Sequence, residues 1–175
     1  MNAPLQIFLE SLIQAHWKVR MREARPLNLS RHFLLRYPAI PIEYIEFLTQ
    51  VGSCMGNDEM VWFLCEDDYN QTTDSAFRWN EFEVQSLEAA GTDEHLKSRI
   101  VKFWDQHLPI ALSVKSQYAF LCIVLTPQDF GAIVCGHEPE YEDVEKVCGS
   151  FRGLTALISA TLKGKLESHV LKDFV

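Results

Sequence analysis

The stretch most informative about the fold of this 175-residue chain is Tyr37-Pro-Ala-Ile-Pro-Ile-Glu-Tyr-Ile-Glu-Phe-Leu-Thr-Gln-Val-Gly52. Pro41 suits the first turn of a helix, because its missing N–H would have no intrahelical partner there. The apolar residues recur at helical spacing and form one face: Ile42, Ile45 and Leu48, widened by Tyr44, Phe47 and Val51. Glycine adopts the left-handed conformation at a helix end without strain, so Gly52 is expected to end this helix. The stretch predicts a short amphipathic helix and no chemical site.

In the segments on either side of this stretch, apolar residues recur either at the spacing of a helix or at the spacing of a strand. Helices are expected over residues 4–16 and 30–36, over residues 93–107 with Thr92 or Asp93 as the N-cap, and after the N-cap Ser150. Residues 77–90 fit either a helix or a strand, and the helix is favoured. Strands are expected over residues 60–65, 110–114, 118–125 and 132–136, with a polar loop at 67–74. A chain of this length is expected to form one domain, residues 1–175. The sequence therefore predicts a single-domain α+β fold, with a mainly antiparallel sheet flanked by helices.

The pattern Pro41-x-x-Tyr-x-x-Phe-Leu-x-x-x-Gly52 resembles the signature helix of the Smi1/Knr4 superfamily, also called SUKH. In that family a proline-led strand, a meander of strands and a final Ser-Phe-x-x-Leu helix follow the signature. The corresponding segments here are Leu108-Pro-Ile-Ala111, residues 120–125 and 130–134, and Ser150-Phe-Arg-Gly-Leu154. The resemblance covers residues 37–162 and leaves residues 1–36 as an N-terminal helical region. It implies the Smi1/Knr4-like α+β fold.

Charge is distributed unevenly along the chain. Residues 1–37 hold six basic and two acidic residues, a net charge of +4, whereas residues 38–175 hold ten basic and twenty-two acidic residues, a net charge of −12. Phosphate binding needs a cationic footprint, so the acidic body argues against direct binding of nucleic acid. It suits a basic protein partner. The basic run at residues 18–22 is expected to be an exposed strand or helix end; the alternative is a patch for an acidic partner, or head-to-tail association, giving a monomer or a weak homodimer.

The expected compartment is the cytoplasm. No apolar run approaches the roughly 20 residues that span a bilayer, and no secretory signal is recognisable at the N-terminus. The five cysteines are an odd number without a C-x-x-C pair, which is typical of reduced thiols in a cytosolic protein.

A search for catalytic, cofactor-binding and metal-binding residues finds no candidates. The chain has no glycine-rich phosphate loop, no G-x-S-x-G and no H-E-x-x-H. Cys135-Gly-His-Glu138 brings a thiol, an imidazole and a carboxylate together, but adjacent strand residues point to opposite faces and a metal needs about four ligands. His95 and His107 are three turns apart on one expected helix, too far to share a metal. The prediction is a protein without enzymatic activity or cofactor.

Two acidic groups remain as candidates for partner binding. The first contains Glu138, Glu140, Tyr141, Glu142, Asp143 and Glu145, and the second contains Asp58, Glu59, Glu66, Asp67 and Asp68. Either group is a self-repelling solvated loop or a docking surface for a cationic partner, with Tyr141 as an aromatic anchor. A Ca²⁺ site is a further alternative, although neither group has the EF-hand spacing.

The resemblance implies a function for these surfaces. Bacterial relatives in the superfamily look like immunity proteins, which bind and neutralise a cognate toxin, often a nuclease, by occlusion. Fungal relatives resemble regulatory scaffolds with long disordered extensions, which this chain lacks. We therefore expect a protein-binding module of the immunity type, with a basic toxin domain as its partner. The alternative is a regulatory scaffold or ligand-binding module without a toxin partner.

Overall fold

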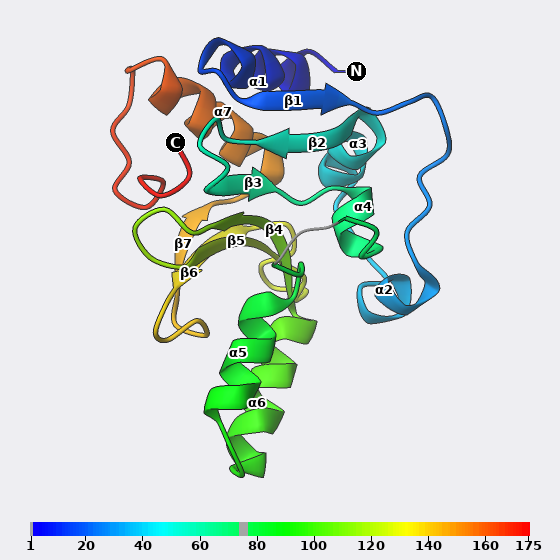
Figure 1. Ribbon diagram of the computed structural model, residues 1–175, viewed down its shortest axis with the longest axis vertical. Helices are drawn as coiled ribbons and strands as arrows, with labels where there is room; N and C mark the ends of the chain where they lie inside the picture. Colours follow the sequence, from blue (N-terminus) through cyan, green and yellow to red (C-terminus); the bar gives the residue numbers. More distant parts are fainter. Residues whose placement is uncertain (1, 74–76) are drawn as a thin grey trace.

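The computed structural model describes residues 2–73 and 77–175 and contains one antiparallel sheet of seven strands within them (Figure 1). The strands lie in the sheet in the order of the sequence, and each pairs antiparallel with the next. They are β1 (Lys18–Met21), β2 (Val51–Met55), β3 (Val61–Phe63), β4 (His107–Ser113), β5 (Ala119–Val124), β6 (Ile133–His137) and β7 (Val144–Cys148). The predicted α+β class with a mainly antiparallel sheet is confirmed.

Helices cover both faces of this sheet (Figure 1). They are α1 (Ala3–Gln14), α2 (Arg31–Arg36), α3 (Ile42–Gln50), α4 (Glu66–Tyr69), α5 (Glu81–Ala89), α6 (Glu94–Asp105) and α7 (Phe151–Leu162). Phe63 of β3 contacts the rings of Phe8 in α1 and Phe47 in α3. Phe120 of β5 points to the opposite face and contacts Phe82 in α5 and Trp104 in α6. The sheet is therefore the middle layer of the domain.

Local capping places several of the helix starts. The side chain of Ser30 accepts a hydrogen bond from the N–H of Phe33 at 3.2 Å, and that of Asp93 accepts from Leu96 at 2.9 Å. Ser150 caps α7 in the same way. Each cap satisfies an N–H that has no partner inside its helix. The predicted caps at Asp93 and Ser150 are confirmed.

The stretch from Tyr37 to Gly52 forms a helix, but its end differs from the prediction. Helix α3 ends at Gln50, and the chain passes through Val51, at φ −110° and ψ 125°, directly into β2. Gly52 lies inside that strand and has no left-handed φ, so its expected role as a helix cap is wrong. Pairing of Val51 with Met21 in β1 ends the helix. Ile42, expected on the core face, is 69% exposed.

Tyr44 on the core face of α3 ties the helix to the sheet through a buried pair of hydroxyl groups. Its hydroxyl lies 2.6 Å from that of Tyr69 and 2.9 Å from the carbonyl oxygen of Leu64. The Tyr69 hydroxyl donates to the carbonyl oxygen of Pro109 at 2.7 Å. Tyr69 belongs to α4, where the sequence predicted a polar loop over residues 67–74; residue 74 lies outside the described residues. Burial of Tyr69 draws this segment into the core.

The C-terminal segment, residues 163–175, packs against the end of the β4–β5 hairpin. Leu171 and Phe174 are fully buried. Ser113 Oγ donates to the carbonyl oxygen of Asp173 at 2.6 Å, and Lys115 Nζ donates to that of Val175 at 3.1 Å. This segment forms one wall of a cavity described below.

Candidate functional site

The first acidic group forms the connection between β6 and β7, beside α5 and α6. We call residues 138–143 the acidic loop. Glu138 Oε1 accepts a hydrogen bond from the N–H of Tyr118 at 3.0 Å, and Glu142 Oε1 accepts from the indole Nε1 of Trp104 at 2.8 Å. The N–H of Asp143 donates to the carbonyl oxygen of Glu140 at 3.0 Å. The Glu138 and Glu142 side chains thus bond the acidic loop to the rest of the fold, and the third hydrogen bond closes a turn within the loop.

Tyr141 is the residue that fastens the acidic loop to α5. Its ring stacks on Phe82 at a centroid distance of 4.8 Å and an interplanar angle of 16°, and its hydroxyl donates to Gln85 Oε1 at 2.9 Å. Burial, reinforced by nearby carboxylates including Glu138, raises the pKa of Tyr141 to about 12. The residue is 5% exposed, so the expected role as an aromatic anchor for a partner is corrected: the ring belongs to the core.

The acidic residues left on the surface are fewer than the sequence indicates. Glu140, Asp143 and Glu145 are exposed, whereas Glu138 and Glu142 are half-buried and each uses an oxygen internally. Glu145 lies in β7, opposite Cys135 of β6, although the sequence predicted a loop there. Five carboxylates in eight residues obscured this strand, because its formation depends on pairing with β6 and not on its own composition.

The second acidic group does not form a common surface. Asp58 and Glu59 lie in the β2–β3 turn, where Asp58 Oδ1 accepts from the N–H of Met60 at 3.1 Å. Glu59 forms an ion pair of 2.6 Å with Lys18 of β1. Asp68 Oδ2 accepts from the N–H of Cys65 at 2.7 Å and caps α4. These carboxylates satisfy local backbone and basic groups of the same chain.

Glu66 is buried and fully engaged. Its Oε2 accepts from Arg22 Nε at 2.6 Å, and its Oε1 accepts from Arg25 Nη1 at 2.9 Å and from the N–H of Asn28 at 3.0 Å. Asp67 lies 3.9 Å from both Arg20 and Arg25. The expectation that Glu66 contacts a partner is therefore corrected: the basic run of the N-terminal region neutralises it. Part of that run forms β1, an edge strand of the sheet.

Glu66→Gln is expected to lower the free energy of unfolding by about 3 kcal/mol near neutral pH. Arg22, whose side chain is 3% exposed, would lose its counter-charge, and breaking a buried pair costs roughly 3–5 kcal/mol; the half-exposed Arg25 places the effect at the lower end. Urea unfolding measures it. Asp67→Asn is the matched control and should cost less than about 1 kcal/mol, because its contacts are long and partly solvated.

The pH dependence of the free energy of unfolding, compared between wild type and Glu66→Gln, tests whether the charge of Glu66 causes the difference in stability. Burial by itself would raise the pKa of Glu66, but hydrogen bonds from Arg22 and the N–H of Asn28, with the charge of Arg22, hold it below its ordinary value of 4.5. A lowered pKa contributes stability above the unfolded-state pKa and loses it as the pH falls through the folded-state value. The difference between wild type and Glu66→Gln should therefore be largest near neutral pH and shrink as the pH falls through 4.5 and below it. A constant difference would contradict the assignment.

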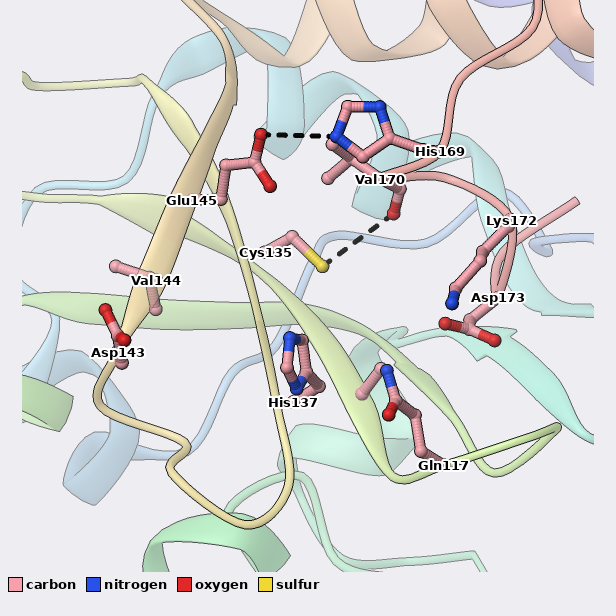
Figure 2. A pocket seen from close by; sticks show the side chains of 11 residues that line it. Gln117, Cys135, His137, Asp143, Val144, Glu145, His169, Val170, Lys172 and Asp173 are labelled. Atoms are coloured by element: carbon pink, nitrogen blue, oxygen red, sulfur yellow. Dashed lines mark hydrogen bonds and ion pairs between the residues drawn. The ribbon is translucent and has the colours of Figure 1, made fainter.

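A cavity of about 330 Å³ opens between the β6–β7 strands and the C-terminal segment (Figure 2). We call it the acidic pocket. Asp143 at the end of the acidic loop and Glu145 in β7 lie on one side, Lys172 and Asp173 lie on the C-terminal segment opposite, and Cys135 lies between them. The remaining lining residues are Gln117, Ala119, His137, Val144, His169 and Val170. The sequence left no signal for the C-terminal wall, because its residues are far from β7 in the chain.

The surroundings of the cysteine in this pocket disfavour a nucleophilic role. Cys135 and His137 are two positions apart on β6 and therefore share a face of the sheet, together with Glu145. Burial raises the pKa of the Cys135 thiol to about 12, and the charges of Asp173 and Glu145 add to the effect. Because a thiolate is needed for nucleophilic attack, this thiol is inert at neutral pH. Among residues 2–73 and 77–175, no cluster of histidine, cysteine and acidic side chains is arranged to hold a metal ion.

The other four cysteines are buried or half-buried, and the two histidines His95 and His107 lie on different elements. All five cysteines are unpaired, and burial raises the pKa of Cys54, Cys65, Cys122 and Cys148 as well. His107 begins β4 and does not lie on α6 as expected; its ring stacks on Phe103 at 4.0 Å, and burial lowers its pKa. His95 remains exposed on α6.

Comparison with known proteins gives no match: no family model fits the chain, and neither a curated protein nor a solved structure is significantly similar to it. None of the helices in the described part of the chain has the length and apolar character needed to cross a membrane. Fold and surface define the class as an α+β protein with a seven-stranded antiparallel meander, an acidic loop bonded to the rest of the fold and a polar cavity beside that loop.

Proposed function

We propose that the protein is a non-catalytic binding module of the Smi1/Knr4 (SUKH) type that acts as a cytoplasmic immunity protein. It binds a basic toxin domain, often a nuclease in this class, and neutralises it by covering the active site. The observation that carries this proposal is the acidic loop, in which the exposed Glu140 and Asp143 adjoin side chains that are bonded to Tyr118, Trp104 and Gln85.

A preorganised loop suits a binding surface for energetic reasons. Association costs free energy when flexible side chains and loops become ordered, and a loop fixed beforehand avoids much of that cost. Glu140 and Asp143 are exposed and form no ion pair within the described residues. Their charge is therefore free to act on a partner. The net charge of −8 extends the attraction and raises the rate of encounter with a basic protein.

Neutralisation by occlusion requires no catalytic step from the protein that binds the toxin. An acidic surface imitates the polyanionic substrate of a nuclease and repels nucleic acid itself, since like charges oppose contact with phosphate. Membrane contact and cofactors have no part in the proposed mechanism. A regulatory scaffold of the Smi1/Knr4 type without a toxin partner is the alternative function, and it would use the same loop for a different protein.

The test is co-expression with the basic protein encoded by the neighbouring reading frame. We expect a stable one-to-one complex by light scattering, loss of the partner's toxicity in cells, and loss of its nuclease activity at equimolar ratio. A complex that leaves toxicity and activity unchanged would favour the regulatory alternative, as would the absence of any complex. The matched control is the same neighbouring protein co-expressed with the Glu140→Lys/Asp143→Lys variant of this chain, which is discussed below.

A further inference from the structure

Helices α5 and α6 cover one part of the sheet face that carries Phe120. Directly paired residues of neighbouring antiparallel strands share a face, so Met55 of β2 and Trp62 of β3 lie on the same face as Phe120. Phe82 and Trp104 of the two helices contact Phe120, and Figure 1 shows both helices extending away from β1 and β2. Over the β1–β3 part of this face lies a cavity of about 620 Å³. We call it the aromatic pocket; its lining includes Arg20, Met55, Trp62, Phe77 and Val114.

The floor of the aromatic pocket is apolar. Met55 and Val114 are half-buried, and the rings of Trp62 and Phe77 meet edge to face, with centroids 6.0 Å apart and an angle of 61° between the planes. A flat ring system can stack on one such ring and meet the other at its edge. The volume lies within the usual range for small-molecule sites, roughly 300–1,000 Å³. The aromatic pocket therefore suits a small aromatic ligand.

Trp62 also provides a hydrogen-bond donor without an acceptor. The residue is 8% exposed, and its indole N–H donates to no acceptor within residues 2–73 and 77–175. This N–H is open to solvent, since Asn80 Oδ1 is the one side-chain polar atom in that part of the chain that is both buried and without a partner. A nearly buried indole usually has an acceptor for its N–H, so the donor favours a ligand with an oxygen substituent on its rings.

Arg20 places a cationic group at the other end of the aromatic pocket. Its guanidinium lies on Gly52, where Nη1 is 3.1 Å from the position that a Cβ would occupy and Nη2 donates to the carbonyl oxygen at 3.3 Å. The Asp67 carboxylate is 3.9 Å from Nη2, which is too far for a hydrogen bond, and the Arg20 side chain is 62% exposed. Most of the guanidinium donors are therefore available to an anionic ligand.

The three carboxylates that line the aromatic pocket have partners within the chain. Glu59 forms its ion pair of 2.6 Å with Lys18, and Asp68 caps α4 through the hydrogen bond described above. Asp67 lies 3.9 Å from a second arginine as well as from Arg20. Since these charges are balanced locally, Arg20 determines that an anion is favoured over a cation.

We propose that the aromatic pocket binds a small hydroxylated aromatic carboxylate, with its rings on Met55 and Trp62 and its carboxylate on Arg20. Met55 and Gly52 are three residues apart on β2, a distance of about 10 Å at roughly 3.3 Å per residue, which two fused rings and a carboxylate can span. The guanidinium can donate two parallel hydrogen bonds to the carboxylate. This inference goes beyond the proposed function, because the aromatic pocket lies over β1–β3, whereas the acidic loop joins β6 and β7.

The experiment uses the full chain, labelled with ¹⁵N, and 6-hydroxy-2-naphthoate as the probe. Amide and indole N–H shifts are followed by NMR during titration. The matched probes are 6-hydroxy-2-naphthamide, which keeps the shape without the charge, octanoate, which carries the charge on a flexible chain, and Ac-Gly-Phe-Gly-NH₂, which presents the aromatic side chain of a protein partner. We expect saturable shifts at Gly52, Met55 and the Trp62 indole with the naphthoate, and binding of each matched probe that is weaker by about fivefold or more.

Variants then assign the effect to the aromatic pocket. Arg20→Gln should weaken binding of the naphthoate about five- to tenfold, equivalent to about 1.0–1.4 kcal/mol, because the carboxylate loses its charged donor. The same variant should leave binding of the naphthamide within about twofold. Lys163→Gln, at an exposed residue that follows α7, removes an equal charge outside the aromatic pocket and is the matched control. Urea unfolding verifies that both variants fold.

Four outcomes would overturn the inference: no saturable shifts at the aromatic pocket, equally tight binding of the naphthamide or octanoate, equal weakening by the two variants, or tighter binding of the tripeptide. The last result would assign the aromatic pocket to a side chain of a protein partner. Failure of the proposed function has a different signature, since a chain without any toxin partner could still bind the naphthoate. Conversely, toxin neutralisation without binding of the naphthoate would remove this inference alone.

Discussion

Glu140→Lys/Asp143→Lys is expected to slow association with the basic partner by about 10- to 100-fold at low salt and to leave the fold intact. Steering by the whole charge distribution contributes roughly 10- to 1,000-fold to association rates, and both residues are exposed in the acidic loop. Glu142 is left unchanged because its carboxylate accepts the indole N–H of Trp104. Stopped-flow kinetics at two salt concentrations measure the effect, which should shrink at high salt as steering is screened.

The matched control is Glu10→Lys/Glu23→Lys, which changes the net charge by the same amount on exposed residues of the N-terminal region. Its association rate should fall by a much smaller factor, because screening confines strong steering to the neighbourhood of the interface. Equal slowing by the two variants would show that only net charge matters and that the acidic loop is a solvated surface. The dissociation rate provides a second readout, since charges at the rim of an interface act mainly on association.

Phe174→Ala is expected to lower the free energy of unfolding by about 3–5 kcal/mol. Phe174 is fully buried in the C-terminal segment, and removal of a buried aromatic ring costs the transfer free energy and leaves a cavity. The change also loosens the segment that carries Asp173, whose carbonyl oxygen accepts from Ser113. Urea unfolding followed by tryptophan fluorescence measures the loss.

Phe130→Ala is the matched control for this prediction. Phe130 is 47% exposed, so the same change of side chain should cost less than about 1 kcal/mol. A small effect at Phe174 would mean that the C-terminal segment contributes little to the stability of the fold. The wall of the acidic pocket would then be weakly held.

The helices were the part of the fold most accessible from sequence. The starts of α6 and α7 follow from Asp93 and Ser150, whose side chains bond to N–H groups three residues ahead. The hairpin of β4 and β5 follows from two apolar runs separated by a polar turn. The end of α3 was missed because Gly52 is a good helix cap by local rules, whereas pairing of Val51 with β1 decides the outcome.

Only the residue types of the candidate site, and not their arrangement, could be predicted from the sequence. The sequence located the carboxylates of the acidic loop. It did not show which side chains point to solvent and which point into the core. Stacking on Phe82 turns Tyr141 inward, and Arg22 draws Glu66 into the interior. Both partners lie far along the chain from the residues they capture, so no local pattern carries the information. The resemblance to the Smi1/Knr4 superfamily stays a prediction that partner binding has to test.

Short-range interactions thus determined several of the helices and the β4–β5 hairpin from sequence alone: caps, apolar periodicity and turns act over about four residues. The charge division between the N-terminal region and the body also followed from sequence. Tertiary structure alone decided that β7 is a strand, that the N-terminal arginines neutralise Glu66, and that the C-terminal segment meets β7 to enclose the acidic pocket. The physical reason is that burial and strand pairing are properties of residues brought together from distant positions, and each exceeds the local preference that it replaces.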